Sequence, residues 1–168
     1  SEKPQVEIVA GAKGVFAIEV FDQDMQGEPG SDRRILDVLS RFKVRFMSKD
    51  TNANTITHYV DTTLKHVKRV VKALEEEFPN AEISTRKVAL VSAIGSDMKV
   101  PGILARSVKS LADKDISVLA IHQCMRQVDI QFVVDEDKYD QAIVALHGAL
   151  IEPHNHEYAI VAASTTAG

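Results

Sequence analysis

The sequence carries an internal repeat with a spacing of about 72 residues, and this repeat limits the folds that the chain can adopt. Four pairs of similar residues lie 72 positions apart: Pro29 and Pro101, Leu39 and Leu111, Val44 and Ile116, and Phe46 and Val118. A longer spacing of 74 relates the Val60-Asp61 pair to Val134-Asp135, so one connector differs in length by about two residues. The repeat implies two similar units, each too small to bury much surface alone, so we expect them to pack together and against another chain.

Hydrophobic periodicity predicts the same order of elements in both halves. Short apolar or alternating runs bounded by turn residues predict strands at residues 5–10, 15–21, 43–47, 55–60, 81–86, 88–94, 116–121 and 128–134. Helical spacing predicts four helices, with Ser31, Thr62 or Thr63, and Asp135 as N-caps and Pro101 in a first turn. The resulting βαββαβ order predicts an α+β chain of two ferredoxin-like units.

These patterns leave two candidates for the last strand of the second unit. No strong strand follows its last helix directly, so either residues 157–163 supply the strand or residues 5–10 do. The second choice would make the first unit an insertion within the second.

Composition narrows the class of protein. A net charge of −4 and 45% apolar residues are typical of a soluble globular chain, and they argue against a nucleic-acid partner, which usually leaves a basic footprint. The single cysteine, Cys124, excludes an internal disulfide and fits a reducing compartment. With no apolar run of membrane-spanning length and no signal-peptide pattern at the N-terminus, we expect a cytoplasmic protein without membrane contact.

Four segments of the second half resemble the second ACT domain of aspartate kinases. They are Lys87-Val-Ala-Leu-Val-Ser-Ala-Ile-Gly-Ser-Asp-Met98, Val100-Pro-Gly-Ile-Leu-Ala-Arg-Ser-Val-Lys-Ser-Leu111, Asp115-Ile-Ser-Val-Leu-Ala-Ile121 and Gln131-Phe-Val-Val-Asp135. The first half resembles, less closely, the first ACT domain of the same family. The resemblance implies that residues 1–13 complete the second domain (87–152), that the first domain (14–86) is inserted in it, and that a tail follows at 153–168.

The resemblance also implies a regulatory function. In that family the tandem ACT domains pair side by side between subunits and bind lysine or threonine, which inhibits the kinase. The chain contains neither the Lys-Phe-Gly-Gly type motif of the kinase domain nor a Gly-x4-Gly-Lys phosphate loop. We therefore expect a regulatory fragment, not an enzyme by itself, whose partners are a second copy, an amino-acid effector and the kinase domain. ATP and Mg²⁺ would belong to that absent domain, and no cofactor is expected here.

Aligned with the family, the effector pocket of the first unit lies where a helix begins and a strand ends. Its candidate residues are Met25, Glu28, Gly30, Ser31 and Asp32 on the loop and helix start, and Val44, Arg45, Ser48, Lys49 and Asp50 on the facing strand. Helix N-terminal amides suit a carboxylate, while Glu28, Asp32 or Asp50 can hold an ammonium group. Lysine-sensitive members place an acid where Arg45 aligns, which leaves threonine, both amino acids or a lost response open.

The second unit has an equivalent candidate pocket, and other functions are weaker. Its residues are Ser96, Asp97, Met98, Gly102 and Gln123. His147, His154 and His156 lack a carboxylate or cysteine at a ligand spacing, so no metal site is expected. RNA binding shares the βαββαβ plan but requires aromatics and a basic sheet that this chain lacks. A dimerisation module without a ligand remains as the alternative.

Overall fold

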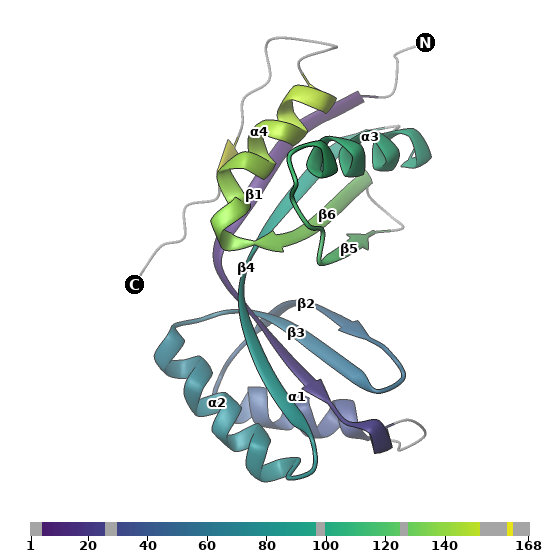
Figure 1. The fold of residues 1–168 in the computed structure, drawn as a ribbon. Helices are drawn as coiled ribbons and strands as arrows, with labels where there is room; N and C mark the ends of the chain where they lie inside the picture. The colour runs from purple at the N-terminus through teal and green to yellow at the C-terminus, as the bar shows by residue number, and fades with distance from the viewer. Residues whose placement is uncertain (1–4, 26–29, 97–99, 125–127, 152–160, 163–168) are drawn as a thin grey trace. The chain divides into compact units, whose positions relative to one another are not determined.

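The chain forms two compact units, described here from a computed structural model over residues 5–25, 30–96, 100–124, 128–151 and 161–162. One unit, Gly14–Lys87, is named the inserted unit. The other combines Ser1–Lys13 with Val88–Gly168 and is named the discontinuous unit. Two long strands, β1 (Gln5–Phe21) and β4 (Glu82–Ser96), belong partly to each unit (Figure 1).

The inserted unit is a four-stranded antiparallel sheet with two helices on one face. After β1 come a short 3-10 turn, η1 (Gln23–Met25), then α1 (Ser31–Arg41), β2 (Phe46–Thr51), β3 (Thr55–Asp61) and α2 (Leu64–Glu77). The strand order β2-β3-β1-β4 leaves β2 at an edge. Alternate residues of β1 and β3 pack against the helices, and the core includes Phe16, Ile18, Val20, Ile35, Leu39, Ile56, Val60, Val67 and Leu74.

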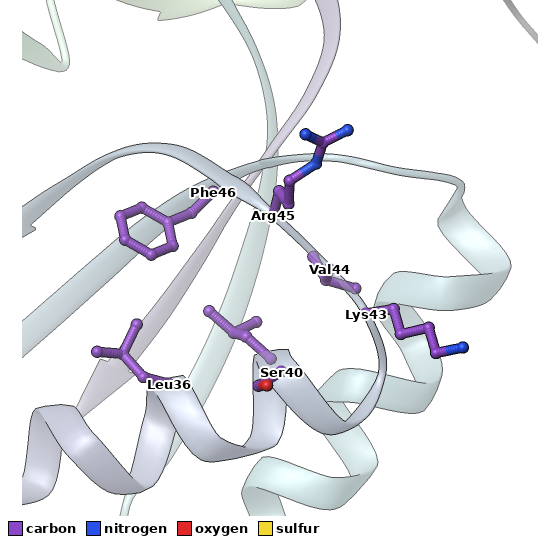
Figure 2. Close-up of a pocket in the computed structure, with 7 residues that line it drawn as sticks. Leu36, Ser40, Lys43, Val44, Arg45 and Phe46 are labelled. Atoms are coloured by element: carbon purple, nitrogen blue, oxygen red, sulfur yellow. The ribbon is translucent and has the colours of Figure 1, made fainter.

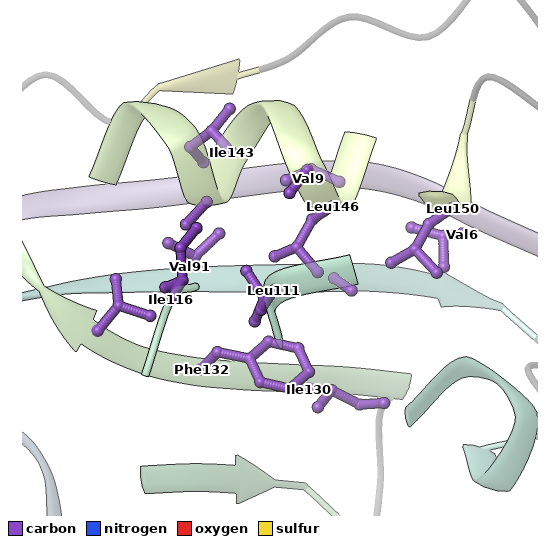
Figure 3. Packing of buried hydrophobic residues seen from close by; sticks show 14 of the residues in the cluster. Val6, Val9, Val91, Leu111, Ile116, Ile130, Phe132, Ile143, Leu146 and Leu150 are labelled. Carbon is purple, nitrogen blue, oxygen red and sulfur yellow. The ribbon is translucent and has the colours of Figure 1, made fainter. Parts of the chain in front are cut away.

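The discontinuous unit repeats this plan with its closing strand taken from the N-terminus. It contains β4, α3 (Val100–Asp113), β5 (Ala120–Gln123), β6 (Val128–Asp135), η2 (Glu136–Lys138) and α4 (Tyr139–Leu150), in the strand order β5-β6-β4-β1. Val6 and Val9 of β1 lie in its core with Val91, Phe132 and Leu146 (Figure 3). The predicted α+β fold of two βαββαβ units, the first inserted in the second, is therefore confirmed. A short strand, β7 (Val161–Ala162), also pairs with β1, in parallel.

Gly11 and Gly14 do not separate two strands, although separate strands were predicted at residues 5–10 and 15–21. β1 continues through both of them, and Gly14 takes a positive φ of 73° that a glycine accepts without strain. A Cβ atom on Gly11 would lie 2.5 Å from Cε2 of Tyr139, so this glycine makes room for the aromatic ring. The predicted break between residues 81–86 and 88–94 is also wrong, because β4 is continuous there.

Both helix-to-strand corners were predicted wrongly in the same way. The strands expected at 43–47 and 116–121 begin later, at Phe46 and Ala120. Two residues after the ends of α1 and α3, Lys43 and Asp115 both take left-handed backbone conformations, with φ of 56° and 57°. The chain then turns so that the next N–H donates to a helix carbonyl: Val44 N to Leu39 O at 2.9 Å and Ile116 N to Leu111 O at 3.0 Å. The repeat therefore extends to backbone geometry.

Two of the three predicted helix caps need correction. Thr63 caps α2 as predicted, accepting a hydrogen bond from His66 N at 3.2 Å. Ser31 is instead the first residue of α1, and Gly30, with φ of 97°, is the N-cap. Asp135 does not cap α4, because the 3-10 turn η2 lies between them and its side chain makes no capping hydrogen bond. Among the described helices, none is long and apolar enough to cross a membrane.

Candidate functional site

The start of α1 and the edge strand β2 bring two of the predicted site residues into contact. Asp32 lies in the first turn of α1, and its Oδ2 atom accepts a hydrogen bond from Nζ of Lys49 in β2. About a third of each side chain is exposed. An acid in a first helical turn is favoured by the partial positive charge of the helix N-terminus. The ion pair therefore joins the helix start to the sheet edge.

A bulge in β2 decides which residues share this contact. The β2–β3 register pairs Phe46 with Val60 and then Ser48 with Tyr59, so Met47 has no direct partner. As a result, Phe46 and Lys49 lie on the face of the sheet that carries the helices, although they are three residues apart. Ser48 and Asp50 lie on the opposite face.

Asp50 is therefore separated from Asp32 by the sheet. Its Oδ2 atom accepts a hydrogen bond of 2.6 Å from the hydroxyl of buried Tyr59. Burial, followed by the hydrogen bond and charge of Asp50, raises the pKa of Tyr59. The described residues among those predicted for the first pocket thus divide between the two faces of the sheet, and Asp32 with Lys49 forms the ion pair.

His58, which was not predicted as a site residue, completes the cluster with Asp32 and Lys49. It lies opposite Lys49 in the β2–β3 register and is 1% exposed. Its Nε2 atom is 3.7 Å from Oδ1 of Asp32, and neither ring nitrogen has a hydrogen-bond partner among the described residues. The signal was present in the sequence: Ile56, His58 and Val60 alternate, which places the imidazole on the apolar face of β3.

The electrostatics of the cluster keep His58 neutral. Burial lowers the pKa of His58 to about 4, against the opposing effect of the Asp32 carboxylate and with a smaller contribution from the Lys49 ammonium. The Phe46 ring and the imidazole pack nearly perpendicular to each other, with a centroid distance of 5.1 Å and an interplanar angle of 82°. Among the described residues, Lys49 is therefore the charged partner of Asp32 near neutral pH.

A groove of about 660 Å³ lies further along α1, against the segment that leads into β2 (Figure 2). Its walls are formed by Leu36, Leu39, Ser40, Lys43, Val44, Arg45 and Phe46. Val44 is buried, whereas the exposed side chain of Arg45 points away from α1 (Figure 2). The cation that reaches Asp32 is consequently that of Lys49, and not that of Arg45, on which the sequence argument about lysine depended.

The remaining described candidates of the first pocket are Met25, Gly30 and Ser31, in η1 and at the start of α1. Met25 is buried in η1 as part of the core, and Ser31 is buried at the first position of α1. Gly30 is the exposed N-cap. Glu28 lies outside the described residues. The described members thus provide one end of a polar site: a helix N-terminus, a carboxylate and an ammonium group.

Three of the five candidates of the second pocket lie within the described residues, each on a different element. Ser96 is the last residue of β4, Gly102 is exposed in the first turn of α3, and Gln123 is exposed at the end of β5. Asp97 and Met98 lie outside the described residues, as do His154 and His156. Within the described residues, no group of three or more histidine, cysteine or acidic side chains is placed to bind a metal ion.

Comparison with known proteins identifies a domain family and a curated protein that this chain resembles. The ACT domain family matches residues 91–150. Aspartate kinase Ask_Ect of Stutzerimonas stutzeri is 53% identical over 163 residues, covering 97% of this chain and 34% of that protein. The chain therefore spans about a third of the length of this curated relative.

Solved structures share the fold at low sequence identity. The regulatory subunit of aspartate kinase from Thermus flavus has a TM-score of 0.75 and 17% identity, covering 86% of this chain and 98% of that one. E. coli aspartokinase III, in a complex with lysine and aspartate, has a TM-score of 0.71 and 16% identity, covering 90% of this chain and 34% of that one. The match along nearly the whole subunit of the Thermus protein shows that this chain shares the fold of that subunit.

Proposed function

Because this chain belongs to the ACT-domain family and corresponds to the regulatory region of aspartate kinases, we propose that it binds a free amino acid and transmits this binding to a kinase domain. The effector would be an end product of the pathway that the kinase serves, lysine or threonine, and its binding would inhibit phosphorylation of aspartate. The chain itself would act as a cytoplasmic regulatory part, while ATP and Mg²⁺ would bind to the kinase domain.

The observation that carries this proposal is the placement of Asp32 beside the start of α1. A free amino acid presents a carboxylate and an ammonium group a few bonds apart. The first N–H groups of a helix have no intrahelical acceptors and can bind the carboxylate, and Asp32 offers an acceptor for the ammonium. A solved relative, E. coli aspartokinase III, is described in complex with lysine and aspartate, which supports an amino-acid ligand for this fold.

The exposed edge of the inserted unit supports pairing with a second copy. β2 is an edge strand, and the side chains of Phe46 and Met47 on it are 41% and 48% exposed. Exposed edge strands with apolar side chains favour association with another strand. We propose that two copies pair along this edge, so that the effector binds at or near the dimer interface. Binding would then favour one arrangement of the subunits over another, which is the requirement for allosteric inhibition.

Calorimetric titration of the isolated chain with threonine and with lysine tests ligand binding. We expect saturable heat with at least one of them and a loss of about tenfold or more in affinity for the Asp32→Asn variant, because the amide is a weaker acceptor for an ammonium group. Asp37→Asn is the matched control, since Asp37 is an exposed acid on the same helix. A chain that forms dimers in sedimentation but gives no heat with either amino acid would support the alternative, a dimerisation module without an effector.

A further inference from the structure

The first half of α2 carries a basic surface without an acidic partner among the described residues. Lys65, Lys68, Arg69 and Lys72 are all exposed, and none of them forms an ion pair with a described residue. The first turn of α2 contains no acidic residue, so these cations add to the partial positive charge of the helix N-terminus. Residues three and four apart are neighbours on a helix, so the cations also repel one another. An acidic surface placed against α2 would relieve both effects.

A hollow with an apolar side chain lies within this basic surface. Its volume is about 590 Å³, and it is lined by Leu64, Lys65, Lys68 and Arg69. The side chain of Leu64 is 53% exposed. An apolar centre with charged residues around it is the usual arrangement of a surface that binds another protein.

The turn η2 and the first half of α4 carry a surface of the opposite sign. Residues 135–144 include four acidic residues and one basic residue. Asp137 and Asp140 are exposed, and the pair that Asp140 forms with Lys13, at 3.8 Å, is too exposed to neutralise it effectively. Val144 lies one turn after Asp140 and is 64% exposed. This surface therefore also combines charges with an exposed apolar side chain.

We propose that the α2 surface of one copy of the chain binds the η2–α4 surface of a second copy. Val144 enters the hollow beside Leu64, while Asp137 and Asp140 pair with the cations of α2. Leu64 and Val144 are the two most exposed large apolar side chains among the described residues, and the charges beside them are opposite in sign. Complementary charges of this kind select the partner and fix its register. Both halves of the contact lie on one chain, so a second copy suffices as the partner.

This contact is separate from the proposed pairing along β2, and it does not require an effector. Each copy carries one surface of each kind, so the contact can close into a symmetric pair or continue from copy to copy. In either case, removing it reduces the mass of the assembly and leaves the pairing along β2 unchanged.

Charge reversal followed by mixing tests the contact in the full 168-residue chain. One variant combines Lys65→Glu, Lys68→Glu and Arg69→Glu, and the other combines Asp137→Lys and Asp140→Lys. Each variant then carries two surfaces of like sign. We expect the weight-average mass in sedimentation to fall to about half that of the original chain, or less, for each variant alone. An equal mixture should regain the original mass, because each variant supplies the surface that the other lacks.

Two further variants separate a specific contact from a general effect of charge. Lys109→Glu with Lys114→Glu adds negative charge at exposed positions in and after the last turn of α3, and should leave the mass unchanged. Val144→Ser keeps the charge and removes the apolar side chain, so it should weaken association through this contact by about tenfold. Circular dichroism spectra establish that each variant is folded. If a charge-reversed variant does not fold, Val144→Ser decides alone.

Four results would overturn the proposal: an original chain that stays a single copy, charge-reversed variants that keep the original mass, a mixture that does not regain it, or unchanged association of Val144→Ser. A loss of mass in the Lys109 and Lys114 variant equal to that in the α2 variant would also overturn it, because net charge would then be responsible. None of these results bears on amino-acid binding, which calorimetry measures separately, so the proposal and the proposed function can fail independently.

Discussion

Removal of residues 1–13 is expected to unfold the discontinuous unit and to leave the inserted unit largely folded. The deleted segment contributes Val6 and Val9, which are 2% and 0% exposed in the core of the discontinuous unit, and it pairs with β4. Burial of each valine contributes about 1.5–3 kcal/mol, and the lost strand pairing adds to this, against a total stability of about 5–15 kcal/mol for a typical domain. Hydrogen exchange measured by mass spectrometry should show lost protection in β6 and α4, and retained protection in β3 and α2.

Two point variants in the same strand provide the matched control for this deletion. Val9→Ala should lower the free energy of unfolding of the discontinuous unit by about 2 kcal/mol, because it leaves space in a packed core. Ile8→Ala should change it by less than about 0.5 kcal/mol, since Ile8 is 36% exposed and is not among the buried residues of that core. Equal loss of protection in both units after the deletion would contradict the assignment of residues 1–13 to the discontinuous unit.

The inserted unit is expected to lose about 3 kcal/mol of stability as the pH falls from 6.5 to 4, because of His58. The pKa of His58 is about 4 in the folded chain and 6.5 for a free histidine side chain, so the unfolded chain takes up a proton first as the pH falls. His58 therefore does not reduce the free energy of unfolding well above pH 6.5. Its destabilising effect grows progressively as the pH falls from 6.5 to the folded pKa. Urea unfolding across this range measures the loss as a change in the free energy of unfolding.

His58→Leu should remove this part of the pH dependence. The substitution replaces a buried imidazole, whose nitrogens lack hydrogen-bond partners among the described residues, with an apolar side chain, so stability above pH 6.5 should be retained or increased. The control is His66→Leu, which leaves His58 unchanged. It removes a different imidazole, whose Nε2 atom lies 2.7 Å from the carbonyl oxygen of Phe42. If the free energy of unfolding of His58→Leu depended on pH between 6.5 and 4 in the same way as that of the original chain, His58 would not be the cause of the acid destabilisation.

Local patterns predicted the fold well because they reflect periodicity, which is a property of consecutive residues. Alternation and helical spacing indicated both βαββαβ units, and the repeat indicated that they are alike. The corners at Lys43 and Asp115 were not predictable in this way, because the apolar residues that follow them resemble the first residues of a strand. Their N–H groups instead donate to carbonyl groups of the preceding helix, which is decided by the left-handed turn before them.

The candidate site was predicted in its parts and not in its arrangement. Asp32 and Lys49 were both candidates, but their contact depends on the bulge at Met47, which alters the face on which later residues of β2 lie. The same bulge places Asp50 on the opposite face, with Tyr59. Such a register shift results from pairing between strands, so single-strand alternation does not reveal it. His58 was not predicted, because its place on the apolar face of β3 is equally typical of a core residue, and its nearness to Asp32 depends on contacts between elements.

We propose that a free amino acid binds where α1 begins and β2 forms the sheet edge. The most direct measurement is a residue-resolved one: amide chemical shifts of the ¹⁵N-labelled chain during titration with threonine. Amino-acid binding at this place should produce saturable shifts concentrated at Ser31, Asp32 and Arg33 and at Ser48 and Lys49. Shifts confined to α2, or a spectrum that threonine leaves unchanged while lysine produces shifts at Gly102 and Gln123, would contradict it.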